Sequence, residues 1–309
     1  MDLQPLPAPD PVIDPTAEVW TQSVTQPPRI WTVFLSVTIA FLTMLALAVA
    51  ATIPFIVMTF LNSQGTTPSQ DDLIGSVTTP IAIFAQGFAG QLGILVVAIG
   101  AAWFSPIEFR RRLGLTDSGL TTQEWLCVGV GSFAPAALGL VLATLLAQIL
   151  APDETAAKLF ENMPLAMVVP WVLFISLFPG FGEEMLFRGL MQRRLLERWR
   201  PWTAITVTSL IFALFHLMPH TVVFAFPIGM WFGYIAWKTG SIWPTILAHV
   251  LINGTWNILN ISKSHLGYSD QLYVAICSLL VVIGIPAFSY SLPAIRRVRT
   301  DFNSDPPKL

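Results

Sequence analysis

The chain has 309 residues, of which 54% are hydrophobic and only 11% are charged. Soluble domains carry about 25% charged residues, so this composition excludes an ordinary soluble domain and predicts an integral membrane protein in contact with the lipid bilayer. The formal net charge of −2 argues against nucleic acid as a partner.

The first residues differ from the rest of the chain. Residues 1–28 contain seven prolines and four acidic residues but no lysine or arginine. Such a segment cannot bury enough apolar surface to fold, and it lacks the basic start of a signal peptide. We therefore expect residues 1–29 to form a disordered, proline-rich tail.

Eight apolar runs follow this tail. They cover residues 30–61, 76–104, 125–151, 165–199, 202–217, 221–237, 241–259 and 271–292. Because about 20 residues cross the hydrocarbon core, the runs predict an all-α, polytopic membrane protein with about eight transmembrane helices. Cys127 and Cys277 both fall in apolar runs, which argues against a disulfide framework or a cysteine zinc site.

Arginines gather at one end of these runs. The clusters lie at residues 110–112, 193–200 and 296–299, and an even number of spans puts all three on the same side. Cytoplasmic loops are enriched in Lys and Arg. We therefore expect a protein of the cell membrane with both termini in the cytoplasm.

One apolar run contains three charged residues, Glu183, Glu184 and Arg188. A charge at the bilayer centre costs at least about 2.5–3.5 kcal/mol, so each one needs a reason to be there. Glu184 and Arg188 are four residues apart and can pair on one helical face, whereas Glu183 points about 100° away. A buried structural ion pair with a snorkelling glutamate would explain the set, but it leaves Glu183 without a local partner.

Two further runs carry polar residues. Phe212 and His216 are four apart in one run, and His249 and Asn253 are four apart in another, with Asn257 one turn further on. A residue spacing of four places two side chains on the same helical face. His216 therefore shares a helical face with Phe212, and His249 shares one with Asn253 and Asn257.

The polar residues share one depth. At about 1.5 Å per residue, Glu183, His216, His249 and Asn253 all fall near the middle of a hydrocarbon core about 30 Å thick. A single membrane histidine is usually a helix-packing residue. Four polar groups on three helices at one level instead predict a shared polar cavity near the bilayer midplane.

The chemistry available in this cavity is a carboxylate, two imidazoles and an amide. The sequence contains neither an H-E-x-x-H zinc motif nor a G-x-S-x-G nucleophile elbow. The remaining route to a carbonyl group is water activated by glutamate, with histidine and asparagine stabilising the oxyanion. We interpret the set as a hydrolytic site, acting on a peptide bond brought into the membrane.

Three motifs in this order resemble those of a known family. They are E-E-x-x-x-R at residues 183–188, F-x-x-x-H at 212–216 and H-x-x-x-N at 249–253. They are similar to the motifs of the CPBP family, the CAAX protease and bacteriocin-processing family also called Abi, which includes the Ras-converting CAAX prenyl endopeptidases. The resemblance covers about residues 165–260, roughly a third of the chain.

The resemblance implies an intramembrane endopeptidase in which Glu183 activates water and the substrate is a membrane-associated protein or peptide, including a CAAX-type one. The residues implied to complete the catalytic site are His216, His249 and Asn253. The residues implied to support it are Glu184, Arg188 and Phe212.

The resemblance leaves the metal question open, because members of this family were long described as metalloproteases. Glu183, His216 and His249 could together bind zinc, since carboxylate and imidazole are zinc ligands. Their spacing does not require a metal, and we favour a metal-free mechanism with no cofactor.

Two other classes of function remain open. A family member could act by binding alone, as an immunity or scaffold protein. A transporter also has polar residues at the midplane and broken helices, but the sequence shows no paired inverted repeats.

The resemblance suggests a division of the chain. We assign residues 1–29 to the tail, 30–151 to N-terminal transmembrane helices, 152–292 to a CPBP-like catalytic region and 293–309 to a basic C-terminal tail. Proline and glycine at 179–182 break the helix just before Glu183, which predicts a water-filled cavity there. From the nearby arginines we expect this cavity to open toward the cytoplasm.

Overall fold

The computed structural model describes residues 29–298, except the side chain of Ala156. The expected disordered tail therefore lies outside the described residues, apart from Arg29. Within residues 29–298 all regular structure is helical, so the all-α class is confirmed. The helix α15 continues to Arg297, so the first five residues that we assigned to the basic tail are helical. The division into two transmembrane regions stays a prediction.

Each apolar run forms one helix or a series of consecutive helices. In chain order these are α2 (Trp31–Ala50) with α3 (Ile53–Asn62), α5 (Pro80–Trp103), α7 (Thr122–Gly131) with α8 (Phe133–Leu146), α10 (Leu165–Glu184) with η1 (Met185–Gln192) and α11 (Arg193–Leu196), α12 (Pro201–Leu214), α13 (Pro219–Thr239), α14 (Trp243–Leu266) and α15 (Asp270–Arg297). Short connecting helices are α4 (Gln70–Val77), α6 (Phe109–Leu113) and α9 (Thr155–Glu161).

Six of these helical segments are long and apolar enough to cross a membrane. They are Trp31–Asn62, Pro80–Trp103, Thr122–Leu146, Leu165–Leu196, Pro219–Thr239 and Asp270–Arg297. The helix α12 is shorter, and α14 has the length to span but carries several polar residues. A multi-pass membrane protein is thus confirmed, whereas the number eight remains a prediction.

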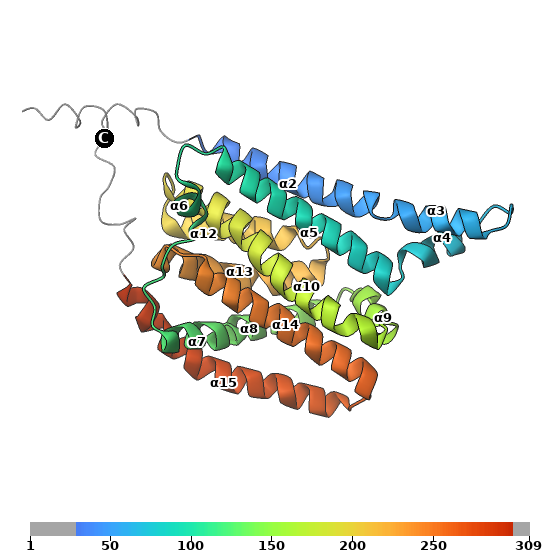
Figure 1. Cartoon of the computed structure of the whole chain (residues 1–309). Coiled ribbons are helices and arrows are strands. Elements are labelled where there is room, and N and C mark those ends of the chain that lie inside the picture. The colour runs from blue at the N-terminus through green and yellow to red at the C-terminus, as the bar shows by residue number, and fades with distance from the viewer. Residues whose placement is uncertain (1–28, 299–309) are drawn as a thin grey trace, which may run out of the picture.

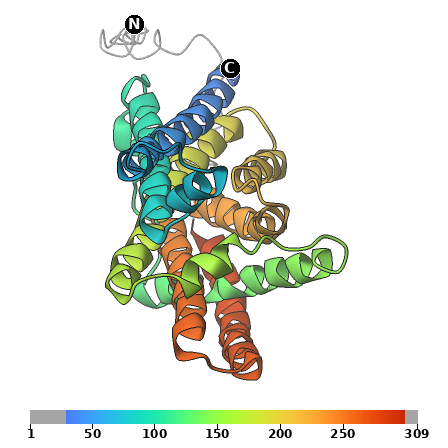
Figure 2. The same cartoon turned by 90° about the vertical axis from the view of Figure 1, so that its right-hand side faces the viewer.

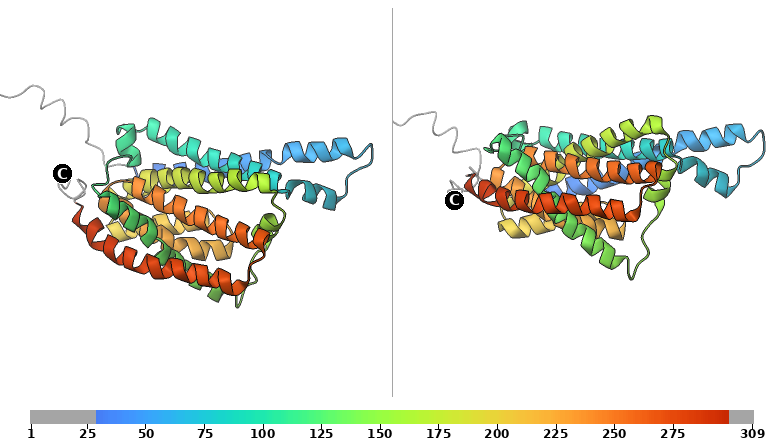
Figure 3. Two further views of the ribbon diagram at one scale, coloured as in Figure 1. Left: turned by 60° about the horizontal axis from the view of Figure 1, so that its bottom comes forward. Right: turned by 90° about the horizontal axis from the view of Figure 1, so that it is seen from below.

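The long helices run roughly side by side (Figure 1). The helices α2 and α5 lie at one side of the bundle and α15 lies at the opposite side, with α10 and α14 between them (Figures 1 and 2). The helix α10 packs against both α5 and α14, while α13 packs against α8 and α12. At one end, α3 and α4 project beyond the other helices (Figure 3). This arrangement places α10 and α14, which carry the first and third motifs, between the outer helices.

Glycine permits the closest helix contacts. A Cβ atom at Gly139 in α8 would lie 2.3 Å from the carbonyl oxygen of Phe224 in α13, and one at Gly131 in α7 would lie 2.7 Å from the backbone of Phe288 in α15. In lipid, helices associate through van der Waals packing rather than the hydrophobic effect, so small residues at contact points determine how closely they approach.

The contact between α8 and α13 can be tested by Gly139→Ala. We expect this substitution to separate the two backbones and to destabilise the protein by about 1–3 kcal/mol, the usual cost of overpacking. The matched control is Gly100→Ala in α5, where an added Cβ meets no atom within 4 Å. Thermal unfolding in detergent measures both variants, and equal midpoints would contradict the close contact.

Candidate active site

Five of the seven predicted site residues lie on the wall of one cavity of about 480 Å³. Residues of α5, α8, α9, α10, α12, α13 and α14 line this cavity, together with the turn after α12. The predicted catalytic residues found on its wall are Glu183, His216, His249 and Asn253. The structure therefore brings together the four side chains that the three motifs carry.

Glu184 and Arg188 do not line the cavity but form a buried ion pair behind its wall. The Arg188 Nη1 atom lies 2.8 Å from Glu184 Oε1, and both side chains are 0% exposed. Arg188 Nη2 also donates to the Gly229 carbonyl oxygen at 3.3 Å, and its Cζ lies 4.2 Å from the ring centroid of Phe212 and 5.3 Å from that of Phe232. The buried guanidinium is therefore compensated by a carboxylate, a carbonyl and two aromatic faces.

Glu184 also orients His249. The His249 Nδ1 atom lies 3.0 Å from the same Glu184 Oε1 that accepts from Arg188. An ionised carboxylate only accepts hydrogen bonds, so Nδ1 carries a proton, and in the neutral ring Nε2 keeps a lone pair. Nε2 lies 3.9 Å from Glu183 Oε2. Glu184 thus pairs with Arg188 and also orients the His249 ring so that its Nε2 atom faces Glu183.

Gln91 from α5 holds the second carboxylate. Its Nε2 atom donates to Glu183 Oε1 at 2.8 Å, which leaves Oε2 on the side of His249. We did not identify this residue from the sequence, because it lies outside the three motifs. The available signal was an amide side chain inside an otherwise apolar span, a position where polar residues usually have a function.

His216 lies just after the end of α12. Its Nδ1 atom is 3.2 Å from the Phe212 carbonyl oxygen, so Nδ1 donates and Nε2 is left for the cavity. The Phe212 ring makes edge contacts with both imidazoles, at centroid distances of 5.3 Å to His216 and 6.0 Å to His249. Phe212 therefore fixes the spacing of the two histidine rings.

The amide of Asn253 points at α10. Its Nδ2 atom donates to the Ile175 carbonyl oxygen at 3.1 Å, and its backbone carbonyl accepts from Asn257 Nδ2 at 2.9 Å. Asn257 in turn accepts from Trp171 Nε1 at 2.9 Å. One N–H of the Asn253 amide is therefore used inside the protein, and the second remains for the cavity.

The cavity does not extend toward the arginine clusters as expected. From Glu183 it continues along Pro179 and Trp171 of α10 to Phe160 of α9 and His220 at the start of α13. Toward the basic end it stops, because the side chains of η1 there are buried. The lining does not support the expected mouth near the arginines, because the charge distribution alone does not show which helix faces are packed.

His220 is a third imidazole on the cavity wall that we did not identify from the sequence. It follows Pro219, which begins α13, and its Nε2 atom is buried without a hydrogen-bond partner. The available signal was simply that the chain contains only four histidines.

The zinc ligand set that the sequence left open is not assembled. Among residues 29–298, no three His, Cys, Asp or Glu side chains come together in a way that could hold a metal ion. Glu183 and His249 approach each other to 3.9 Å, but no third donor of these kinds joins them among the described residues. Two donors are too few for a zinc site held by three protein ligands, and no step proposed below involves a metal.

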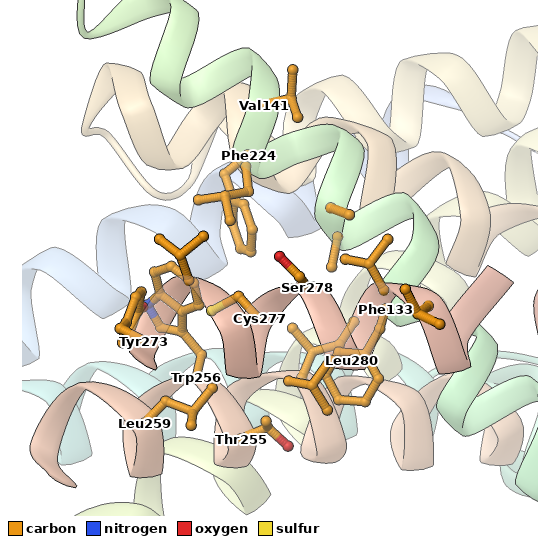
Figure 4. Close-up of a pocket in the computed structure, with 17 residues that line it drawn as sticks. Phe133, Val141, Phe224, Thr255, Trp256, Leu259, Tyr273, Cys277, Ser278 and Leu280 are labelled. Carbon is orange, nitrogen blue, oxygen red and sulfur yellow. The ribbon is translucent and has the colours of Figure 1, made fainter. Parts of the chain in front are cut away.

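A second cavity, of about 460 Å³, adjoins the first on the side of α15 (Figure 4). Its lining is almost wholly apolar, and it shares four residues with the first cavity: Leu140, Ile252 and the aromatic residues Phe224 and Trp256. These two rings lie 5.7 Å apart between their centroids, so together they form part of the wall between the cavities. Cys277 lies on this second wall, as expected for a packing residue in an apolar run.

The buried pair can be tested by Glu184→Gln. This change leaves the Arg188 charge without its carboxylate, and we expect a loss of about 3–5 kcal/mol, the usual cost of removing one partner from a buried ion pair. The control is Glu154→Gln, because Glu154 is 73% exposed and pairs with Lys158 at 3.3 Å. Thermal unfolding should show less than about 1 kcal/mol for this exposed pair. Equal losses would contradict the role of Glu184.

The comparisons with known proteins agree with the motifs. Residues 165–255 match a protein-family model described as type II CAAX prenyl endopeptidase Rce1-like. No curated protein and no solved structure matches the chain. The matched segment includes all three motifs and every site residue predicted from them, whereas Gln91 lies outside it. The resemblance is thereby confirmed: over residues 165–255 the chain is similar to the CAAX prenyl endopeptidases of the Rce1-like family.

Proposed function

We propose that this chain is an intramembrane endopeptidase that hydrolyses a peptide bond of a membrane-associated protein or peptide with water activated by Glu183. The family match supports an endopeptidase of the CAAX type. The observation that carries the mechanism is the 3.9 Å separation of Glu183 Oε2 and His249 Nε2. Two hydrogen bonds of about 2.8 Å that meet at one water oxygen at about 90° span roughly 4 Å, so the pair is spaced to bind one water molecule.

Glu183 acts as the base in this proposal. Its carboxylate takes a proton from the water, the oxygen of which attacks the carbonyl carbon of the peptide bond. The same carboxyl group then gives the proton to the leaving amine. Gln91 supports this role because its hydrogen bond to Oε1 leaves Oε2 to face the water.

The oxyanion is stabilised by His216 and Asn253. Because Nδ1 of His216 donates to the Phe212 carbonyl, its Nε2 atom faces the cavity and can donate to the oxyanion only when the ring carries a proton on both nitrogens. The second N–H of the Asn253 amide adds a neutral donor.

The substrate approaches from the end of the bundle that holds α9. The cavity extends from Glu183 to this end, whereas η1 closes the end where the arginines cluster. If the arginine-rich end faces the cytoplasm, as the positive-inside rule predicts, the cavity opens toward the other face of the membrane. Its wall of phenylalanine and tryptophan rings favours an apolar segment as the substrate.

The base is tested by Glu183→Gln. The substrate is first identified by comparing the membrane proteomes of cells with the wild-type protein and with the variant. The purified variant should then cleave at least about 10²-fold more slowly, because the amide cannot accept the proton of water. Its unfolding temperature should stay close to that of wild type, because glutamine can still accept from Gln91.

The control is Glu197→Gln, which removes a carboxylate that pairs with Arg112 and Arg194 at the arginine-rich end. This variant should retain cleavage. Wild-type cleavage by folded Glu183→Gln protein would reject Glu183 as the base, and an unchanged cellular phenotype would favour the immunity or scaffold alternative.

The direction of approach is tested by cysteine labelling in a background without Cys127 and Cys277. Thr221→Cys places a thiol on the cavity wall near α9. The references are Asp71→Cys at the same end of the bundle and Glu108→Cys at the arginine-rich end. A membrane-impermeant thiol reagent should label Thr221→Cys from the side that labels Asp71→Cys. Labelling from the side of Glu108→Cys would show that the proposed direction is wrong.

A further inference from the structure

Pro179 leaves one backbone carbonyl of α10 without its usual donor. Proline has no N–H, so the carbonyl four residues earlier, that of Ile175, loses the hydrogen bond of a regular helix. Water is absent from the bilayer core, so such a group has to be satisfied from within the protein. The position of this carbonyl matters because Glu183 follows Pro179 by one helical turn.

The side chain of Asn253 supplies the missing donor. Its Nδ2 atom donates to the Ile175 carbonyl oxygen at 3.1 Å from the neighbouring helix α14. Asn257 supports it from the next turn, because its Nδ2 atom donates to the Asn253 carbonyl at 2.9 Å while its Oδ1 accepts from Trp171 at 2.9 Å. Two polar links, at Trp171 and Ile175, therefore join α10 to α14 on this side of the proline.

Along α10, Glu183 lies between these two links and a third polar link to α14. On its other side, Glu184 of α10 accepts from His249 of α14 at 3.0 Å. Between the two sets of bonds the helices touch, since a Cβ at Gly180 would lie 2.8 Å from Val250 Cγ2. The stretch of α10 that carries Glu183 is thus clamped at both ends to the helix that carries His249.

We propose that Asn253 is a positioning residue: its amide replaces the helix donor lost at Pro179 and so holds Glu183 opposite His249. This role is additional to the proposed oxyanion role, because it uses one N–H of the Asn253 amide for the protein backbone and leaves the other for the substrate. The catalytic consequence rests on the proposed function, whereas the link between Asn253 and Pro179 does not.

A double-mutant cycle tests the link. Pro179→Ala restores an N–H that can donate to the Ile175 carbonyl. In that background the hydrogen bond from Asn253 is no longer needed to satisfy this carbonyl. Asn253→Ala should lower the unfolding temperature by several degrees in the wild-type chain and by less than half as much in the Pro179→Ala chain. Pro179→Ser supplies the same N–H and replaces Pro179→Ala if that variant does not purify.

Two matched controls separate this effect from general destabilisation. Pro170→Ala removes the other proline of α10, four residues after Ala166, and should leave the cost of Asn253→Ala undiminished. Asn257→Ala breaks the bonds to Trp171 and to the Asn253 carbonyl, neither of which involves the Ile175 carbonyl, and should cost the same with and without Pro179. An equal cost of Asn253→Ala in the wild-type and Pro179→Ala chains would overturn the proposal.

Kinetics give a second readout. A positioning role predicts that Asn253→Ala lowers kcat on the order of 10²-fold, the cost of misplacing a catalytic group by about 1 Å, with KM little changed. A fall in kcat with no change in unfolding temperature would instead assign Asn253 to the oxyanion alone. Because the thermal cycle needs no cleavage, it remains decisive even if Glu183→Gln proves fully active and the proposed function fails.

Discussion

The buried ion pair of Glu184 and Arg188 is the constraint on which the rest of the site depends. Neither charge can remain at this depth without the other, because an unpaired charge in the bilayer core costs several kcal/mol. The pair sits where α10 passes into η1, a segment with the wider i→i+5 hydrogen-bonding of a π-helix, which is often found at functional sites. Arg188 and Gln192 of η1 both donate to α13, at the carbonyls of Gly229 and Gly233. The pair therefore anchors η1 to α13, and through His249 it also anchors α14.

The helix that carries Glu183 and Glu184 departs from regular α-helical hydrogen bonding on both sides of these carboxylates. A proline one turn before Glu183 and a π-helix directly after Glu184 both depart from regular α-helix hydrogen bonding. In lipid a carbonyl freed by proline has to be satisfied by a neighbouring group, and here the Asn253 amide of α14 bonds to the Ile175 carbonyl. The same bond joins the helices of the first and third motifs, so local irregularity and assembly of the site are linked.

The bundle is asymmetric in charge and in packing. Arginines gather at the end of the bundle that holds α6, α11 and the last turn of α15, and the cavity extends toward the opposite end, where α9 lies. The apolar second cavity adjoins the first on the side of α15 (Figure 4). In the proposed function, an apolar peptide segment would lie between the aromatic walls of the first cavity, on the side away from the arginines.

The sequence by itself determined the class of the protein, the places of its long helices and the identity of the motif residues. These features are local, since length and hydropathy decide whether a helix can span a membrane, and a spacing of four residues decides which side chains share a face. It also paired Glu184 with Arg188 correctly, because that pair lies within two turns of one helix. Only the tertiary structure decided that His249 joins this pair, that Gln91 holds Glu183, that Asn253 replaces the donor lost at Pro179, and that the cavity extends away from the arginines. Each of these depends on which faces of distant helices pack together, and small residues at contact points such as Gly180 determine that packing without leaving a periodic signal in the sequence.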